Sequence, residues 1–381
     1  MAQFTVNDDI LEKCIPEEGE TVITVPYGIT VIGRDALCGL QSVISVTLPD
    51  SLKVICDGAF YGCSSLISVT LPQSTEKLGS CAFAQCGALK TIQLDDDLTE
   101  IGNSAFWGCT SLESIMIPHG ITKVGYNLFG GCISLTSVTL PDSITELDER
   151  AFKECSALTS ITLPGALLSI GNMAFLNCHS LRSVTVPDSV KSIGEKAFFM
   201  CESLSELEIP DSVTSVGGDA FSDCENVTVR NTASGKPLYK AVTATDGSSA
   251  YNFILRNIWG AEGFDFSAQD SYFPALQDEK LQFEIAFSRL MYKVELSADT
   301  ERQYLDFLYN NAEKAVRYCI DKDSEELLRF SDSIGLITKD NISALTVYAD
   351  EHGNTAVTAY ILNAAGRLND DKRDIFSELE L

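Results

Sequence analysis

The sequence predicts an α+β protein in which a long repeat solenoid precedes a small all-α domain of helical hairpins. Two observations predict this fold class. A motif recurs about nine times with a 23-residue period, which is typical of a solenoid. Farther along the chain, apolar residues recur at helical spacing. We therefore expect an N-terminal cap (1–20), a solenoid (21–242), an irregular linker (243–277) and a helical domain (278–381).

Several marks define the repeat, and they keep step with one another. An apolar–x–apolar–Pro segment ends at the same place in each copy, with aspartate once in place of proline, at Pro26, Pro49, Pro72, Asp95, Pro118, Pro141, Pro164, Pro187 and Pro210. An Ala-Phe pair follows in most copies, and then a cysteine, at Cys63, Cys86, Cys109, Cys132, Cys155, Cys178, Cys201 and Cys224. A leucine follows nearly all of these cysteines at a fixed interval. This regularity predicts one coil per repeat.

The residue types of one copy predict its local structure. In the segment 68–72, Val69 and Leu71 alternate with Ser68 and Thr70, which is the mark of a strand, and the proline ends it. A glycine that follows most prolines at a fixed interval suits a bend with positive φ. The Ala-Phe pair is expected to point inward from a short helical or 3₁₀ segment. Stacked coils would then share one core, with a parallel sheet on one face and the helical segments on the other.

The eight cysteines at one repeat position have two interpretations. Equivalent residues of adjacent coils lie roughly 5 Å apart if each coil rises by one strand spacing, and a disulfide could span that distance. An evenly spaced column in the core more simply indicates small, buried, reduced side chains. Such a column favours a reducing compartment.

The unit I/V-x-I/L-P-x-x-V/I-x-x-I-G-x-x-A-F-x-x-C-x-x-L resembles the BspA-like class of bacterial leucine-rich repeats over about residues 20–230. The resemblance implies a right-handed solenoid that binds proteins or surfaces, and many members look like cell-surface adhesins. The sequence shows neither a secretory signal pattern nor a sorting motif. We therefore expect a cytoplasmic protein, with an exported adhesin as the alternative.

Beyond the repeats, Pro237 is expected to open a short helical stretch. Ser297 is expected to cap a helix whose apolar face runs from Tyr304 to Ile320. Two later helical segments start near Asp323 and Asn354, at a spacing close to the ankyrin period. This domain resembles degenerate ankyrin repeats, although the ankyrin signature is absent.

Charge and motifs restrict the function. The net charge of −27 argues against nucleic acid and anionic membranes as partners, and no apolar run is long enough for membrane insertion. We find no catalytic, nucleotide-binding or zinc motif, so we expect no enzyme activity, cofactor or metal. The favoured interpretation is a protein-interaction module whose partner and oligomeric state the pattern does not define. The alternatives are an adhesin that binds host protein or glycan, and an enzyme with a site in the helical domain or between domains.

Candidate contact residues are those that depart from the repeat. The outward strand positions are mostly serine and threonine, and larger groups interrupt them at Lys90, Gln93, Glu113, Met116, Arg182, Glu206 and Glu208. After the Ala-Phe pair, Trp107 and Phe199 place aromatic rings on a ridge, where they could anchor a ligand or pack on neighbouring coils.

Overall fold

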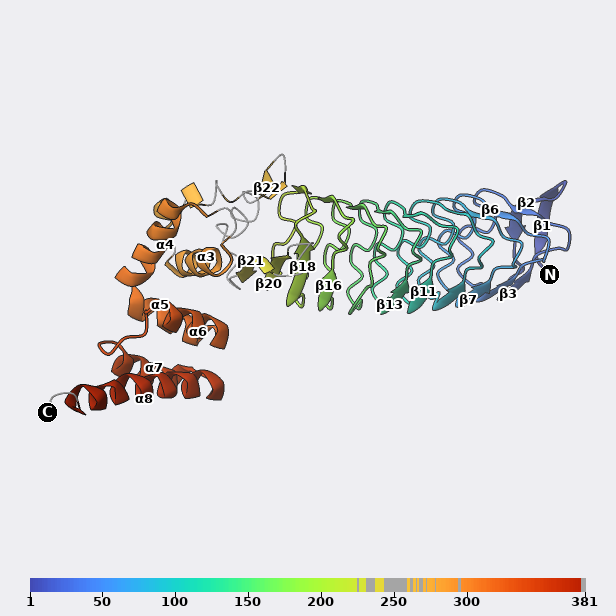
Figure 1. The fold of residues 1–381 in the computed structure, drawn as a ribbon. Helices are drawn as coiled ribbons and strands as arrows, with labels where there is room; N and C mark the ends of the chain where they lie inside the picture. Colours follow the sequence, from blue (N-terminus) through green and yellow to red (C-terminus); the bar gives the residue numbers. More distant parts are fainter. Residues whose placement is uncertain are drawn as a thin grey trace. The chain divides into compact units, whose positions relative to one another are not determined.

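The computed structural model of the chain describes residues 1–224, 226–230, 237–242, 259–260, 263–264, 266, 270–271, 273–277, 279–293 and 296–377. The chain forms two compact units, Met1–Asp265 and Phe266–Leu381. The first contains a β-solenoid and the second a group of helices (Figure 1). Much of the predicted linker 243–277 lies outside the described residues.

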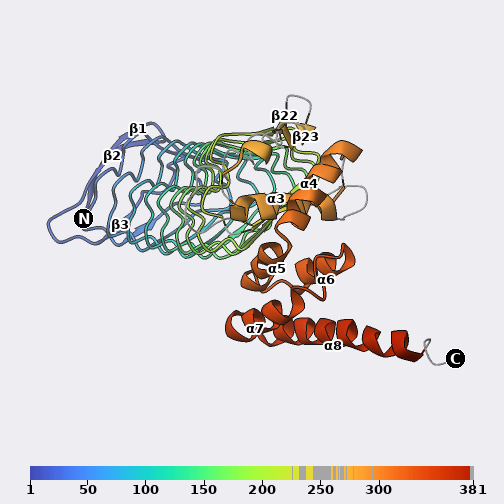
Figure 2. The same ribbon diagram turned by 90° about the vertical axis from the view of Figure 1, so that its left-hand side faces the viewer.

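The first unit confirms the predicted solenoid. We number its coils from 1 (residues 22–44) to 9 (residues 206–228), all of equal length. Most coils contain a long strand that pairs in parallel with its neighbour, and in the three-residue strands the central residue is buried. These strands are β3 (Val22–Thr24), β5 (Ser45–Thr47), β7 (Ser68–Thr70), β9 (Thr91–Gln93), β11 (Ser114–Met116), β13 (Ser137–Thr139), β16 (Ser183–Thr185), β18 (Glu206–Pro210) and β20 (Asn226–Arg230). The stacked coils are visible in both ribbon views (Figures 1 and 2).

A second parallel sheet face, which the sequence analysis did not predict, is built from very short strands. They are β4 (Val31–Ile32), β6 (Val54–Ile55), β8 (Lys77–Leu78), β10 (Glu100–Ile101), β12 (Lys123–Val124), β14 (Glu146–Leu147), β15 (Ser169–Ile170), β17 (Ser192–Ile193) and β19 (Ser215–Val216). Such strands are too short for a visible alternation, and their pairing partners come from adjacent coils. We call the two surfaces the long-strand face and the short-strand face.

The Ala-Phe segments are consecutive turns, so the expected helical or 3₁₀ segments are not formed. In coil 3, Cys81 and Gln85 have φ values of 55° and 60°, in the left-handed region. Amide bonding alternates along the segment: the Tyr61 N–H donates to Gly58 O at 2.9 Å, whereas the Phe60 N–H donates to Ala82 O of the next coil at 2.8 Å. Every second amide therefore ties two coils together, which a continuous helix could not do. We call the surface of these segments the turn ridge.

The core of the solenoid is a stack of phenylalanine rings flanked by thiols. Successive rings from Phe60 to Phe221 lie 4.9 to 6.2 Å apart and are nearly parallel. Each cysteine of the repeat position donates its S–H to a buried carbonyl oxygen of the preceding coil, as Cys86 does to Phe60 O at 3.1 Å. All thirteen cysteines of the chain are free. At the repeat position, cysteine is therefore used as a small buried side chain that also satisfies a carbonyl group.

The repeat glycines have a different role from the one expected. Their φ values are not positive. A Cβ at most of them would lie 2.2–2.6 Å from backbone atoms of the preceding coil, as at Gly79, Gly102, Gly171, Gly194 and Gly217. Glycine therefore favours the close approach of two coils, because a Cβ would force them to shift, as they must where Cys56 and Asp148 occupy this position.

Gly194→Ala tests this explanation. We expect it to lower the free energy of unfolding by about 1–3 kcal/mol through overpacking. The loss should not be larger, since Asp148 occupies the same repeat position in coil 6. The matched control is Gly165→Ala, where an added Cβ meets nothing within 4 Å. Urea unfolding should leave that variant unchanged or slightly stabilised. Equal losses in both variants would rule out the steric explanation.

Antiparallel strands flank the parallel sheets. At the N-terminal end, β1 (Gln3–Asn7) pairs with β2 (Ile10–Ile15), and β2 pairs in parallel with β4. At the other end, β21 (Pro237–Val242) pairs with β20. The helical stretch expected after Pro237 is therefore wrong, because this segment pairs with the edge of β20 instead. Two short strands, β22 (Trp259–Gly260) and β23 (Gly263–Phe264), form a further antiparallel pair.

The second unit consists of η1 (Phe273–Ala275), α3 (Glu279–Met291), α4 (Ala298–Asn310), α5 (Ala312–Asp321), α6 (Glu325–Ser333), α7 (Ile342–His352) and α8 (Thr355–Ser377). Ser297 caps α4 as predicted, and its side chain accepts a hydrogen bond from Thr300 N. The single helix expected up to Ile320 is divided at Asn311, whose side chain donates to Phe307 O at 2.9 Å. None of the described helices is both long and apolar enough to cross a membrane.

Two helical hairpins, α5–α6 and α7–α8, stack so that α5 packs on α7 and α6 packs on α8. The sequence spacing noted for these segments reappears in their packing. Arg317 lies over the ring of Tyr348 at 4.6 Å, and Arg329 lies over Tyr360 at 5.5 Å. The two residues of each pair are 31 positions apart in the sequence, the same interval as from Asp323 to Asn354. The second hairpin therefore meets the first through equivalent positions. The ankyrin resemblance stays a prediction.

Candidate functional site

The long-strand face presents rows of hydroxyl groups. The first and third residues of its three-residue strands are exposed or half-buried, and most are serine or threonine. Parallel pairing places each beside its equivalent one coil away, as Ser45 lies beside Ser68 and Ser68 beside Thr91. This surface is therefore polar, regular and held by a rigid core, which suits recognition by specific departures from the pattern.

The first predicted cluster runs from the end of coil 3 to the start of coil 5. Lys90 and Glu113 directly precede β9 and β11, and Gln93 and Met116 end these strands. All four side chains are exposed, and Met116 is 66% exposed. The Glu113 N–H donates to Lys90 O at 3.1 Å, so these two residues lie on adjacent coils. The structure thus brings this cluster onto one part of the face.

The second predicted cluster consists of Arg182 at the end of coil 7 and two glutamates at the start of coil 9. Arg182 directly precedes β16, and Glu206 and Glu208 are the first and third residues of β18. Pairing places Glu206 beside Ser183 and Glu208 beside Thr185. The side chains of Arg182 and Glu208 are exposed, and that of Glu206 lies outside the described residues. Arg182 and Glu208 therefore flank the outward hydroxyl groups of β16.

The two predicted ridge residues are not part of either cluster. Trp107 is 37% exposed and Phe199 is half-buried, and both lie on the turn ridge. They are four coils apart, which corresponds to roughly 19 Å at one strand spacing per coil. The structure therefore does not bring them together.

Strand pairing on the long-strand face is interrupted at two coil boundaries, which the sequence analysis missed. β9 and β11 belong to different sheets, and in coil 7 only Ser160 forms a bridge, to Ser183. Elsewhere a turn serine donates its hydroxyl to the preceding coil, as Ser143 does to Ile121 O at 2.6 Å. At the interrupted boundaries this serine is replaced, by Gly120 in coil 5 and by Ala166 in coil 7. In coil 4 the serine is replaced by Asp97, and yet β9 still pairs with β7 of the preceding coil. Loss of the serine therefore accompanies both interruptions but does not by itself cause one.

A groove of about 480 Å³ lies at the interruption in coil 7. Four hydroxyl side chains and a short apolar floor line it, and the lining residues are Ser160, Ile161, Thr162, Leu163, Gly165, Ser183, Thr185 and Pro187. The second predicted cluster is adjacent, because Arg182 precedes Ser183 and Glu208 pairs with Thr185. Gly165 and Ala166, which replace the usual Asp-Ser, were the available sequence signal for this groove.

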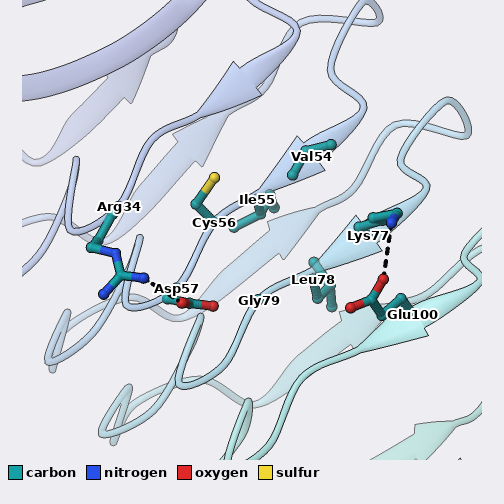
Figure 3. A pocket seen from close by; sticks show the side chains of 9 residues that line it. All are labelled: Arg34, Val54, Ile55, Cys56, Asp57, Lys77, Leu78, Gly79 and Glu100. Atoms are coloured by element: carbon teal, nitrogen blue, oxygen red, sulfur yellow. Dashed lines mark hydrogen bonds and ion pairs between the residues drawn. The ribbon is translucent and has the colours of Figure 1, made fainter.

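A second groove, of about 240 Å³, lies on the short-strand face of coils 1–4 (Figure 3). Arg34 pairs with Asp57 at 2.8 Å at one end, and Lys77 pairs with Glu100 at 3.0 Å at the other. The half-buried Cys56 lies between them, and burial raises the pKa of its thiol. The charged side chains of this groove are paired with each other. It therefore offers a ligand fewer available polar groups than the groove of coil 7.

The repeat of the chain matches a family model described as the BspA type leucine rich repeat region, in six copies. The matches cover residues 17–132 and 99–228, more than half of the chain. The chain belongs to the BspA-type leucine-rich repeat family. This confirms the family that the repeat resembles.

Solved bacterial structures are similar to this BspA-type chain. A leucine rich cell surface protein from Faecalibacterium prausnitzii is 32% identical, with 60% of this chain and 74% of that chain covered and a TM-score of 0.48. A leucine-rich repeat protein from Bacteroides ovatus is 24% identical, with 61% and 69% covered and a TM-score of 0.47. The T. pallidum leucine rich repeat protein is 26% identical, with 58% and 86% covered and a TM-score of 0.35. Among curated proteins, none matches the chain significantly.

Most thiols at the cysteine position of the BspA-type repeat are poor nucleophiles. Burial raises the pKa of Cys109 to about 12, and it raises the pKa values of Cys132, Cys155 and Cys178 well above the ordinary range. The thiolate, which attacks electrophiles and binds metals, is therefore disfavoured. Among the described residues, no group of three or more His, Cys, Asp or Glu side chains is placed to hold a metal ion.

Proposed function

We propose that this BspA-type chain is a non-enzymatic binding protein displayed at the cell surface, which holds a protein partner on the long-strand face around coils 7–9. One observation carries the proposal. The groove of about 480 Å³ lies at one of the two interruptions of the long-strand face and beside the charged positions Arg182 and Glu208. Departures from a repeat pattern are where a solenoid gains specificity.

The chemistry of the groove favours a polypeptide. Hydroxyl groups of Ser160, Thr162, Ser183 and Thr185 can donate to and accept from main-chain groups, and Ile161 and Leu163 form an apolar floor. Arg182 and Glu208 place opposite charges beside the groove. These charges fix the orientation of a partner. Repeats of the BspA type are typical of bacterial surface proteins, and this supports surface display over the cytoplasmic location expected from the sequence.

Thr162→Arg tests the groove. We expect purified protein to bind at least one member of a panel of immobilised extracellular host proteins in surface plasmon resonance. The arginine would fill the groove and weaken that binding at least about tenfold, a loss of about 1.4 kcal/mol. The control is Thr47→Arg at the same repeat position of coil 2, where the face is regular. Equal binding by both variants, or equal loss in both, would refute the assignment of the groove.

A cytoplasmic scaffold remains the second candidate, because all thirteen cysteines are free. Protease treatment of intact host cells separates the two. Digestion in intact cells supports surface display, whereas survival in intact cells together with digestion in the lysate would place the protein inside.

A further inference from the structure

One part of the turn ridge is free of charge. In coils 2–5 the turn segments 58–66, 81–89, 104–112 and 127–135 contain no aspartate, glutamate, lysine or arginine. The flanking coils differ, since coil 1 contributes Asp35 and coil 6 contributes Arg150, Lys153 and Glu154. The chain has a net charge of −27, so four adjacent uncharged segments form a distinct surface. We call it the neutral ridge.

Large aromatic and small side chains alternate along the neutral ridge. The position after the Ala-Phe pair or its equivalent is Tyr61 in coil 2, Ala84 in coil 3, Trp107 in coil 4 and Gly130 in coil 5. Tyr61 is 39% exposed and Trp107 is 37% exposed, while Ala84 is fully buried. Two rings therefore project from a low floor, with one small residue between them.

Polar groups accompany the rings. Within the part of the chain that the structure describes, the side chains of Tyr61, Gln85 and Trp107 have no hydrogen-bond partner. The Gln85 amide lies over Gly108, where an added Cβ would come within 2.3 Å of its nitrogen. The phenol, the amide and the indole N–H can therefore hydrogen-bond to a neutral polar ligand.

We propose that the neutral ridge binds an extended, neutral β-1,4-linked glycan, with Tyr61 and Trp107 each stacking on a sugar ring. Hydrogen bonds between the turn segments keep these coils in contact, as from Gln85 N to Trp107 O at 2.6 Å. The two rings are two coils apart, roughly 9.6 Å at twice the strand spacing. In an extended β-1,4-linked glycan every second sugar presents the same face, at nearly this repeat. Sugar rings combine apolar C–H faces with hydroxyl edges, which match aromatic rings flanked by neutral polar groups.

This site goes beyond the proposed function, because it lies on another surface and takes another class of ligand. The neutral ridge occupies the turn segments of coils 2–5, whereas the proposed protein site occupies the long-strand face of coils 7–9. A failure at one site therefore leaves the other untouched, and the Thr162→Arg variant serves as a control for glycan binding.

The experiment is isothermal titration calorimetry of the full chain with cellohexaose and chitohexaose. We expect binding of at least one of them, no comparable binding of maltohexaose, whose α-linkages curve the chain, and weaker binding of the disaccharides, which cannot reach both rings. Tyr61→Ala and Trp107→Ala should each weaken binding at least about tenfold. Trp107→Phe keeps an aromatic ring and should bind more tightly than Trp107→Ala. Phe199→Ala changes the same repeat position outside the neutral ridge and should bind like the original chain.

Three results would overturn the proposal. They are no heat from either β-linked hexasaccharide at millimolar concentration, equal affinity for maltohexaose, or a loss in Phe199→Ala as large as in Trp107→Ala. If Trp107→Ala instead abolishes binding of a protein ligand while no oligosaccharide binds, the ridge is a protein site and the glycan assignment is wrong. Thermal melting of each variant confirms that the solenoid remains folded.

Discussion

Replacing Asp270 by alanine is expected to destabilise the helical unit by about 3–5 kcal/mol, because it leaves a buried cation without its carboxylate partner. The side chain of Arg289 is fully buried, and it donates to both carboxylate oxygens of Asp270, at 2.9 and 2.8 Å. Tyr304 donates to the same carboxylate at 2.5 Å, and the guanidinium lies 3.8 Å from the centre of the Phe266 ring. Far-UV circular dichroism during urea unfolding measures the loss.

Two further variants make this expectation specific. Asp270→Asn keeps an acceptor but removes the charge, so it should fall between the original chain and the alanine variant. Lys314→Ala removes an exposed ion pair with Glu279 and should change the unfolding free energy by less than about 1 kcal/mol. If Asp270→Ala costs no more than Lys314→Ala, the buried pair is not a major source of stability in this unit.

The sequence was sufficient to predict the solenoid because each of its requirements recurs in nearly every coil. The buried Val69 and Leu71, the Phe60 ring and the Cys63 thiol all occupy equivalent places in the other coils. A property shared by so many copies can be recognised without knowing the distance between any two residues. The same argument explains why the family could be named from the repeat alone.

The missed features depend on contacts between coils. The only signature of a short strand such as β6 is its hydrogen bonding to neighbouring coils. The reason for glycine at positions such as Gly194 is the backbone of the preceding coil, which one copy of the repeat does not reveal. Likewise, the division of the long helix at Asn311 depends on a side-chain hydrogen bond to Phe307 O. Local patterns carry no information about such distances.

The candidate site was predicted in part. Arg182 and Glu208 lie beside a groove that the sequence analysis did not identify, although Gly165 and Ala166 marked its position. Trp107 was singled out together with Phe199, which lies four coils away, whereas Tyr61, the second ring of the proposed glycan site, lies only two coils away. The binding roles of all these residues stay predictions. The cytoplasmic location expected from the sequence is not supported by the family, whose repeats are typical of surface proteins.

Removing one ring from the phenylalanine stack should have a cost that depends on the coil. Phe83→Ala and Phe129→Ala each delete a fully buried ring, so each should lower the free energy of unfolding by about 3–5 kcal/mol. Both sheet faces pair coil 3 with its neighbours, whereas both lose their pairing between coils 4 and 5. The remaining ties at that boundary include the Phe106–Phe129 stack at 5.8 Å and turn-ridge bonds such as Gly108 N to Gly130 O at 2.8 Å.

Phe129→Ala should therefore also weaken the coupling between the two halves of the solenoid. In a repeat protein each coil is stabilised by its nearest neighbours, so a weak boundary lets the halves unfold separately. We expect a lower urea midpoint in both variants, and a shallower or two-step transition in Phe129→Ala alone. Hydrogen exchange should then report faster exchange on one side of coil 5 than on the other. Equally steep single transitions in the two variants would mean that the interrupted sheets do not weaken this boundary, and that the ring stack and the turn ridge suffice to keep the solenoid cooperative.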